Sequence, residues 1–337
     1  MIIQENISLK PYNTFGIDVN AKHFVSVNHI DELKAFLVSN IYSNIFILGG
    51  GSNMLLTQNI ETLVLHINLK GISIESKTDN VVKVKASAGE NWHEFVLWCL
   101  DNNFGGIENL SLIPGNVGTA PIQNIGAYGV ELKDVFESCE ALHIKSGTLK
   151  TFSKSDCQFD YRNSVFKNEL KGEYIIVNVT FNLTTRNHHV KTGYGAITNE
   201  LEKQHISKPT IKDVANAVIA IRSSKLPDPK IIGNSGSFFK NPVISKTAYN
   251  LLKENFTEMP CYEVSKDLVK IPAGWLIEHA GFKGKTFGNY GVHKNQALVL
   301  VNYNDAKGED IKNLAHLIQK TILRIFNIEL EVEVNII

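Results

Sequence analysis

Two glycine-rich segments hold the residue types best suited to binding a phosphorylated ligand. The first, Gly49-Gly50-Gly51-Ser52-Asn53, directly follows the apolar run at 44–48, which predicts a buried strand. Glycines allow backbone N–H groups to approach an anion closely, and the serine and asparagine add hydrogen-bonding groups. The spacing matches neither the G-K-[ST] of a P-loop nor the dinucleotide motif G-x-G-x-x-G. Taken alone, the segment is explained equally well by a sharp turn.

The second segment strengthens the ligand-binding interpretation. Residues 113–129 contain four glycines in seventeen positions and almost no charge. A surface loop would be more polar, and a buried strand would contain fewer glycines. Backbone that lies flat against a large planar ligand satisfies both constraints. Together the two segments predict a dinucleotide cofactor, with the first at its pyrophosphate and the second along an isoalloxazine ring.

Length, charge and hydropathy limit the class of protein. The 337 residues exceed what one hydrophobic core usually serves, so we expect two or three domains. Lysine plus arginine and aspartate plus glutamate both number 34, which argues against a nucleic-acid binder with a broad basic face. No apolar run of about 18 residues and no signal-peptide pattern occurs, so we expect a cytoplasmic protein without membrane insertion.

The cysteines and histidines outline neither a metal site nor a disulfide framework. Cys99, Cys139, Cys157 and Cys261 lie far apart without a C-x-x-C motif, and we expect reduced, mostly buried thiols. The histidines are scattered, with only His188-His189 adjacent, and we expect no metal.

Short strand-like runs alternate with helical ones along the chain, which predicts an α+β fold. Apolar residues at helical spacing predict helices at 31–38, 90–102, 210–221 and 309–326. Compact or alternating apolar runs predict strands at 44–48, 62–67, 81–87, 174–183 and 328–336. In the last strand, Glu329, Glu331 and Glu333 share the face opposite the apolar residues. The apolar stripe of the last helix consists of Ile311, Leu314, Ile318, Ile322 and Ile325.

The best candidate for a linker is Lys225-Leu226-Pro227-Asp228-Pro229-Lys230, because two prolines so close together forbid a helix and interrupt a strand. We therefore divide the chain into three domains. An α/β unit at 1–70 bears the first glycine segment, and a mixed α+β unit at 71–224 completes the cofactor site. Residues 225–337 form an α+β substrate domain.

Long motifs in both halves of the chain resemble one family of flavoenzymes. The first half contains N-T-F-G at 13–16, L-G-G-G-S-N at 48–53 and I-P-G-N-V-G-T-A-P-I-Q-N-I-G-A-Y-G-V-E at 113–131. Further along are Y-R-N-S-V-F-K at 161–167, G-N-S-G-S-F-F-K-N-P at 233–242 and L-E-V-E-V at 330–334. Among FAD-binding proteins of the vanillyl-alcohol oxidase type, these motifs resemble the UDP-N-acetylenolpyruvoylglucosamine reductases of peptidoglycan synthesis. Asn335 departs from the basic residue that often follows Glu-Val in this family.

The resemblance implies an FAD-binding fold in two subdomains followed by a C-terminal substrate domain. It also implies that NADPH reduces the flavin and that the enolpyruvyl group of a UDP-amino sugar then accepts the hydride. Relatives with a covalent flavin attach it through a histidine in or near the glycine loop; neither segment contains one, so we expect non-covalent FAD. The implied cofactor residues are Gly49, Gly50, Gly51, Ser52, Asn53, Pro114, Gly115, Gly118, Thr119, Ile122 and Gly126.

Such a reaction needs a proton donor and a partner for the developing enolate. By resemblance Ser237 is the proton donor; the alternative is a serine that caps a turn. The planar fork of Arg162 matches the substrate carboxylate, although arginines more commonly form structural ion pairs. The family motif selects Glu333, which as a protonated acid would hydrogen-bond the enolate carboxylate. Strand alternation alone does not distinguish the three glutamates and predicts only a solvated face.

Further residues match family positions that contact the substrate. Lys225 and Tyr194 correspond to contacts with the diphosphate. In the subclass that keeps the Tyr-Gly loop, that loop closes over the nucleotide. The remaining substrate residues are Tyr128, Tyr161, Asn241 and Gln296. The sequence thus predicts a UDP-sugar as small-molecule substrate and a monomer that binds no nucleic acid.

Two other functions stay open. A flavin oxidase of the same superfamily would act on a free sugar or alcohol, with oxygen in place of NADPH. A non-catalytic UDP-sugar or flavin-binding regulator would need no proton donor, so the presence of Arg162, Ser237 and Glu333 argues against it.

Overall fold

The computed structural model describes residues 2–39, 42 and 44–337. The chain forms two compact units, and each combines segments that are distant in the sequence. The first unit comprises Met1–Ile7, Ala21–Gly50 and Glu61–Ser224; the second comprises Ser8–Asn20, Gly51–Ile60 and Lys225–Ile337. The longest segment of the second unit begins at Lys225, the first residue of the proline-containing linker. A further division near residue 70 stays a prediction.

The first unit contains a four-stranded sheet in the order β1-β2-β5-β3. Helix α1 (Ile30–Ser39) buries Leu33, Phe36 and Leu37, which recur at helical spacing. Strands β3 and β5 are parallel, with Leu48 opposite His66. The first glycine segment follows a strand, as the sequence predicted, but of that strand only Leu48 is buried and the other residues are partly exposed. The strands are β1 (Gln4–Ser8), β2 (Asn20–Val27), β3 (Ile45–Leu48) and β5 (Ile60–Ile67).

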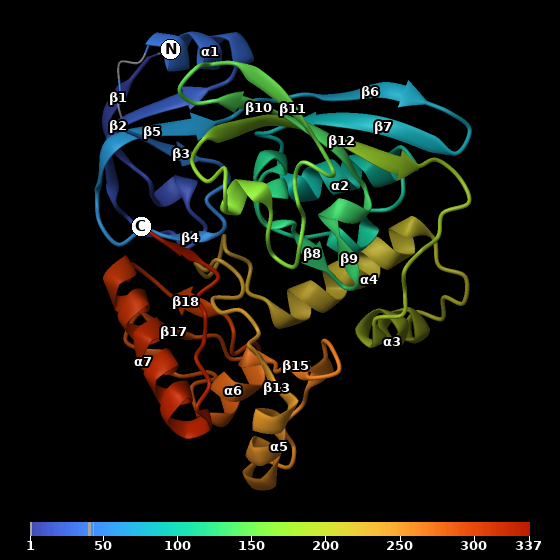
Figure 1. Cartoon of the computed structure of the whole chain (residues 1–337), viewed down its shortest axis with the longest axis vertical. Helices are drawn as coiled ribbons and strands as arrows, with labels where there is room; N and C mark the ends of the chain where they lie inside the picture. Colours follow the sequence, from blue (N-terminus) through green and yellow to red (C-terminus); the bar gives the residue numbers. More distant parts are fainter. Residues whose placement is uncertain (1, 40–41, 43) are drawn as a thin grey trace. The chain divides into compact units, whose positions relative to one another are not determined.

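The other large sheet of the first unit has five antiparallel strands in the order β11-β10-β12-β7-β6 (Figure 1). Its central strand β12 is buried along nearly its whole length. Val179 and Phe181 pack in the core cluster that contains α2, whereas Val177 packs in the cluster that contains Leu65 of β5. The strands are β6 (Ile72–Lys77), β7 (Val81–Ser87), β10 (Phe136–His143), β11 (Leu149–Ser153) and β12 (Tyr174–Thr184).

Of the further helices of the first unit, α2 and α4 follow their sequence signals, whereas α3 was not predicted. Helix α2 (Trp92–Asp101) is capped by Asn91, whose side chain accepts a hydrogen bond from the Glu94 N–H at 3.1 Å. Thr210 and Asp213 form the predicted capping pair of α4 (Ile211–Lys225). Helix α3 (Gly195–Lys203) directly follows Tyr194. Between α2 and β10 the chain forms only short elements, namely η2 (Glu108–Leu110), η3 (Val117–Thr119), η4 (Pro121–Gln123), β8 (Gly126–Ala127), β9 (Val130–Glu131) and η5 (Leu132–Asp134). After β11 comes η6 (Val165–Lys167).

The second unit is built from small sheets and three helices. Strands β13-β15-β14 and β16-β17-β18 form two three-stranded sheets, and β4 pairs in parallel with β19. The strands are β4 (Met54–Leu55), β13 (Val243–Ser245), β14 (Tyr262–Glu263), β15 (Leu268–Lys270), β16 (Thr286–Phe287), β17 (Tyr290–Val292), β18 (Leu300–Asn302) and β19 (Asn335–Ile336). The helices are α5 (Lys246–Asn255), α6 (Ala273–His279) and α7 (Gly308–Phe326), with η1 at Lys10–Tyr12.

Two details at the end of the chain differ from the sequence expectation. Phe326 rather than Ile325 completes the buried stripe of α7, and Ile325 is 40% exposed. The strand expected at 328–336 is regular only at β19. The described residues 328–334 form no regular strand; their bridge between Val332 and Phe239 is flanked by hydrogen bonds from the Lys240 N–H to the Glu331 carbonyl and from the Glu333 N–H to the Phe238 carbonyl, each at 2.9 Å.

Within the described residues, none of the helices combines the length and the apolar character needed to cross a membrane.

Gly118 marks a place where the first unit admits no side chain. A Cβ at this residue would lie 2.4 Å from the Cβ of Ala88. We expect Gly118→Ala to lower the free energy of unfolding by about 1–3 kcal/mol through overpacking, measured by urea denaturation.

Gly195→Ala is the matched control for that substitution. A Cβ at Gly195 has no atom of the described residues within 4 Å, so stability should change by no more than about 0.5 kcal/mol. Equal stability of the two variants would show that the chain at Gly118 moves aside without cost.

Candidate active site

The second glycine segment is held by backbone pairing with the start of α2. The Trp92 N–H donates to the Gly115 carbonyl, and the Val117 and Gly118 N–H groups donate to the Glu90 and Ala88 carbonyls, each at 2.9 Å. A bridge joins Asn91 to Asn116 in the middle of this ladder. The segment is therefore fixed by hydrogen bonds that require no ligand.

The first glycine segment packs directly on the second within the first unit. A Cβ at Gly49 would lie 2.6 Å from Cγ2 of Thr119, and one at Gly50 would lie 2.8 Å from Oδ1 of Asn116 and 3.0 Å from Cα of Gly115. Such distances exclude any larger residue unless the backbone shifts. The structure thus brings together the two segments that the sequence assigned to one cofactor.

The rest of the first glycine segment, Gly51 to Asn53, belongs to the second unit. Gly51 has a φ of +59°, and a Cβ there would lie 2.0 Å from the Tyr12 carbonyl oxygen. The Asn53 carbonyl accepts hydrogen bonds from the backbone N–H of Asn335 at 3.2 Å and from its side-chain Nδ2 at 2.8 Å. Asn335, the residue that departs from the family pattern, therefore anchors this segment.

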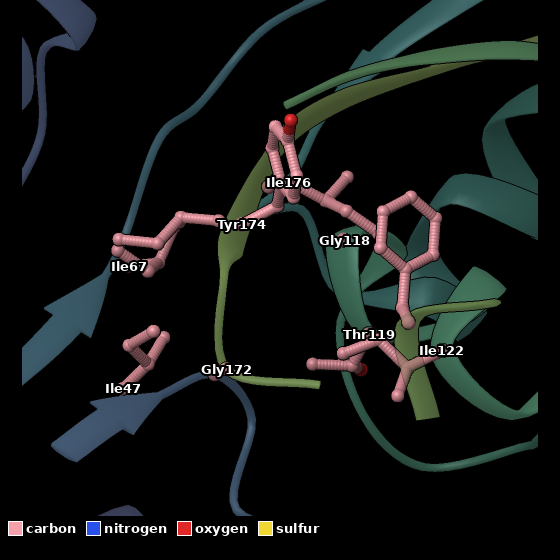
Figure 2. Close-up of a pocket in the computed structure, with 12 residues that line it drawn as sticks. Ile47, Ile67, Gly118, Thr119, Ile122, Gly172, Tyr174 and Ile176 are labelled. Atoms are coloured by element: carbon pink, nitrogen blue, oxygen red, sulfur yellow. The ribbon is translucent and has the colours of Figure 1, made fainter. Parts of the chain in front are cut away.

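A largely apolar pocket of about 180 Å³ opens beside both glycine segments in the first unit. Figure 2 shows Ile47 and Ile67 on one side and Thr119 and Ile122 on the other, with Tyr174 also at its lining. Pockets for drug-sized ligands span roughly 300–1,000 Å³, so this one accepts a part of a dinucleotide. An apolar pocket with Gly49 and Gly118 in its lining is suited to a planar ring next to a phosphate chain, which is the chemistry of FAD.

Arg162 lies at the tip of a tight turn that is tied to the second glycine segment. Asp160 and Asn163 exchange backbone hydrogen bonds around it, and Arg162 has a left-handed φ of 55°. Its Nη2 donates to the Gly126 carbonyl at 2.9 Å, and the Ser164 hydroxyl donates to the Ile122 carbonyl at 2.7 Å. A non-glycine residue at positive φ persists only where its surroundings hold it. Those hydrogen bonds hold the guanidinium beside Gly126.

Tyr128 and Tyr194, both predicted to contact substrate, meet in the first unit. Their rings pack edge to face with centroids 5.3 Å apart. Burial raises the pKa of the Tyr128 hydroxyl, so it stays protonated and able to donate. Tyr194 is 54% exposed, and Tyr161, 45% exposed, lies against the Arg162 guanidinium.

Arg222 is a residue that the sequence analysis missed. Its Nε donates to the Leu112 carbonyl at 3.2 Å, and the charge of its guanidinium acts on the nearby Tyr128 hydroxyl. Burial, with a smaller contribution from the nearby positive charge of Arg162, lowers its pKa, although an arginine keeps its proton under such conditions. Its position three residues before Lys225, on the same face of α4, was the available signal.

Ser237 and Glu333 lie on neighbouring extended segments of the second unit. The Glu333 N–H donates to the carbonyl of Phe238, the residue after Ser237, at 2.9 Å. Ser237 is exposed between Gly236, at φ +70°, and the fully buried Phe238. Glu333 is half-buried, whereas the exposed Glu331 forms an ion pair with Lys240. The structure thus distinguishes two glutamates that strand alternation treated as equal.

Asn241 and Gln296 meet at the N-terminal end of α6. The Asn241 Oδ1 accepts a hydrogen bond from the Ala273 N–H at 2.9 Å, and a Cβ at Gly274 would lie 3.2 Å from Oε1 of Gln296. Lys225 is exposed at the end of α4. The structure shows the local contacts of Asn241 and Gln296 and the exposure of Lys225. That these residues contact the substrate stays a prediction.

The fold and the two glycine segments define an FAD-binding flavoprotein, and residues 21–153 match the model of an FAD binding domain. Residues 228–337 match the model described as UDP-N-acetylenolpyruvoylglucosamine reductase, C-terminal domain. The chain belongs to the UDP-N-acetylenolpyruvoylglucosamine reductase family.

Relatives along the full chain support this membership. The reductase of Flavobacterium johnsoniae is 59% identical over 337 residues and is covered completely, as is this chain. That of Pseudomonas aeruginosa is 45% identical over 99% of this chain and 98% of its own length. A crystal structure of the reductase from Thermus caldophilus aligns over 99% of both chains with a TM-score of 0.69 and 22% identity, which supports the fold.

Proposed function

We propose that this chain reduces the enolpyruvyl group of UDP-N-acetylenolpyruvoylglucosamine to give UDP-N-acetylmuramate, with NADPH as hydride donor and FAD as cofactor. The reaction serves peptidoglycan precursor synthesis. Family membership along the full chain supports the reaction and the cofactors. The observation that carries the residue assignment is the pairing of the Ser237 and Glu333 segments in the second unit.

Bound FAD supplies a hydride carrier between NADPH and the terminal methylene carbon of the enolpyruvyl group. Arg162 binds the carboxylate of that group, because its planar fork donates to both carboxylate oxygens and its charge is permanent. The charge stabilises the enolate that develops when the hydride arrives. Its hydrogen bond to the Gly126 carbonyl limits the positions that the guanidinium can take.

Ser237 donates the proton to the carbon next to the carboxylate. Its hydroxyl is small and exposed, and it is flanked by a glycine turn and buried phenylalanine. A serine hydroxyl is a weak acid that donates only to a strong base, and the carbanionic carbon of an enolate is one. Glu333, protonated, hydrogen-bonds the enolate carboxylate from the neighbouring segment.

We propose that Tyr194 and Lys225 bind the UDP diphosphate and that the chain belongs to the subclass whose Tyr-Gly loop closes over the nucleotide; the Thr192-Gly193-Tyr194-Gly195 motif supports this. Tyr128 contributes to substrate binding through its contact with Tyr194. Tyr161, Asn241 and Gln296 complete the proposed substrate contacts. We further propose that the protein is a cytoplasmic monomer that binds no nucleic acid; the balance of 34 basic and 34 acidic residues supports the last point.

Ser237→Ala should separate the two half-reactions. Reduction of the flavin by NADPH should continue, because Ser237 takes no part in it. Re-oxidation by the enolpyruvyl sugar should slow by about 10²–10⁴, the usual contribution of a positioned general acid. Anaerobic stopped-flow absorbance of the flavin in separate single-turnover experiments measures both rates.

Ser235→Ala is the control, because Ser235 is buried and bonds Thr14 and the Met54 carbonyl instead. Ser235→Ala should lower the free energy of unfolding but should not slow flavin re-oxidation selectively. The wild-type protein must be re-oxidised by the enolpyruvyl sugar; turnover with oxygen and a free sugar, without NADPH, would establish the oxidase instead. Equal slowing of both half-reactions in Ser237→Ala would make Ser237 structural.

Glu333→Gln should strongly suppress re-oxidation, because the amide keeps the size of the side chain but cannot act as a carboxylic acid. Glu331→Gln should behave nearly as wild type, because it loses only a surface ion pair with Lys240, worth about 0–1 kcal/mol. Single-turnover re-oxidation of both variants decides between them. If flavin re-oxidation were slow in Glu331→Gln and normal in Glu333→Gln, the catalytic carboxyl would be that of Glu331.

A further inference from the structure

Leu112 holds an unfavourable backbone conformation directly before the second glycine segment. Its φ is +58°, in the left-handed region that leucine rarely adopts. Such strain persists only where neighbouring groups fix the residue. The next residues are Ile113, Pro114 and Gly115, so the conformation of Leu112 sets the direction in which the segment begins.

Both polar groups of the Leu112 backbone are bound by side chains. The Leu112 N–H donates to Nδ1 of His93 at 3.0 Å, and the Leu112 carbonyl accepts from Nε of Arg222 at 3.2 Å. Because Nδ1 of His93 is an acceptor, the imidazole is neutral and carries its proton on Nε2. His93 follows Trp92, whose indole N–H donates to the Leu110 carbonyl at 2.9 Å.

The same arginine reaches the predicted substrate residues. The Arg222 guanidinium lies close enough to act electrostatically on the Tyr128 hydroxyl, and the Tyr128 ring packs edge to face on Tyr194. A change in the Leu112 backbone therefore shifts the guanidinium that supports this tyrosine pair. His93 binds the N–H of Leu112, and Arg222 binds the carbonyl of the same residue.

We propose that His93 is a positioning residue, whose neutral imidazole fixes Leu112 and thereby the start of the second glycine segment and the guanidinium of Arg222. The proposal rests on the proposed function only in taking FAD as the ligand of that segment. His93 itself need not touch the cofactor. Without its acceptor, Leu112 relaxes, and FAD binding must restore the strained backbone.

The charge state of His93 makes the arrangement sensitive to acid. Burial, and next the positive charge of Arg222 on α4, lower the pKa of His93 from 6.5, while Glu94 on its own helix acts in the opposite direction. Because the folded protein lowers the pKa of His93, neutral His93 stabilises the fold fully above pH 6.5, the pKa of an unfolded histidine. This stabilisation is lost as the pH falls through the lower pKa that His93 has in the folded protein. Protonation turns the acceptor into a donor and places a second cation near Arg222.

The test compares FAD release from the holoenzyme of four proteins between about pH 5 and pH 8, followed by the fluorescence of free FAD after dilution. The proteins are wild type, His93→Asn, His93→Leu and His29→Asn. Asparagine places Oδ1 where the imidazole has Nδ1, so it keeps the acceptor but cannot titrate. Leucine removes the acceptor. His29 is an exposed histidine of the first unit and controls for histidine removal.

Wild type and His29→Asn should bind FAD about tenfold more weakly at the acid end, a change of about 1.4 kcal/mol. His93→Asn should keep the affinity of wild type at high pH and lose most of the pH dependence. His93→Leu should bind about tenfold more weakly at every pH, as expected for an unsatisfied N–H.

Wild-type affinity and pH dependence in His93→Leu would overturn the proposal, as would unchanged pH dependence in His93→Asn. Should His93→Leu not fold, the comparison of wild type with His93→Asn still decides. A wild-type protein that binds no FAD at any pH would instead contradict the proposed function.

Discussion

The structure of the candidate site depends on one short ladder of backbone hydrogen bonds, between residues 88–92 and 115–118. It ties the second glycine segment to the start of α2, and α2 is anchored in the core of the first unit through Trp92 and Phe95. Gly49 and Gly50 of the first glycine segment pack on the second segment. The Arg162 side chain donates a hydrogen bond to the Gly126 carbonyl, nearer the C-terminal end of the second segment. A polar surface loop would have to be ordered by the ligand; this segment is ordered by the protein.

The residues that we propose for the chemistry come from both units, and each unit holds them by its own local contacts. The first unit carries the permanent charges, Arg162 and Arg222, each bonded to a backbone carbonyl that limits its position. The second unit carries the proposed acids, Ser237 and Glu333, on paired extended segments. Oriented charges stabilise a developing enolate without reorganising when the reaction occurs, and a separate proton donor completes the reduction. In each unit, hydrogen bonds to the backbone limit the positions of the proposed residues or of the segments that carry them.

Much of this arrangement could be predicted from the sequence, because glycine content, helical periodicity and capping residues are local signals. They located α1, α2, α4, α7 and the glycine segments. Local signals could not predict which segments make up the second unit, because residues 8–20 and 51–60 belong to it only through contacts with residues far away in the sequence. The same holds for Leu112 and His93, whose roles follow from a positive φ and one hydrogen bond. Periodicity predicted Ile325 as the last buried residue of α7, whereas the structure buries Phe326. Residues three and four positions after Ile322 both lie near the same helix face, so spacing alone does not distinguish them.

If the second glycine segment is organised before the flavin binds, hydrogen exchange of the flavin-free protein will show it. The amides of Trp92, Val117 and Gly118 donate to backbone carbonyls of the ladder, and exchange reports the free energy of opening such bonds. They should exchange nearly as slowly without FAD as with it, and far more slowly than amides of exposed loops. Exchange at the rate of an unstructured chain until FAD is added would contradict that organisation.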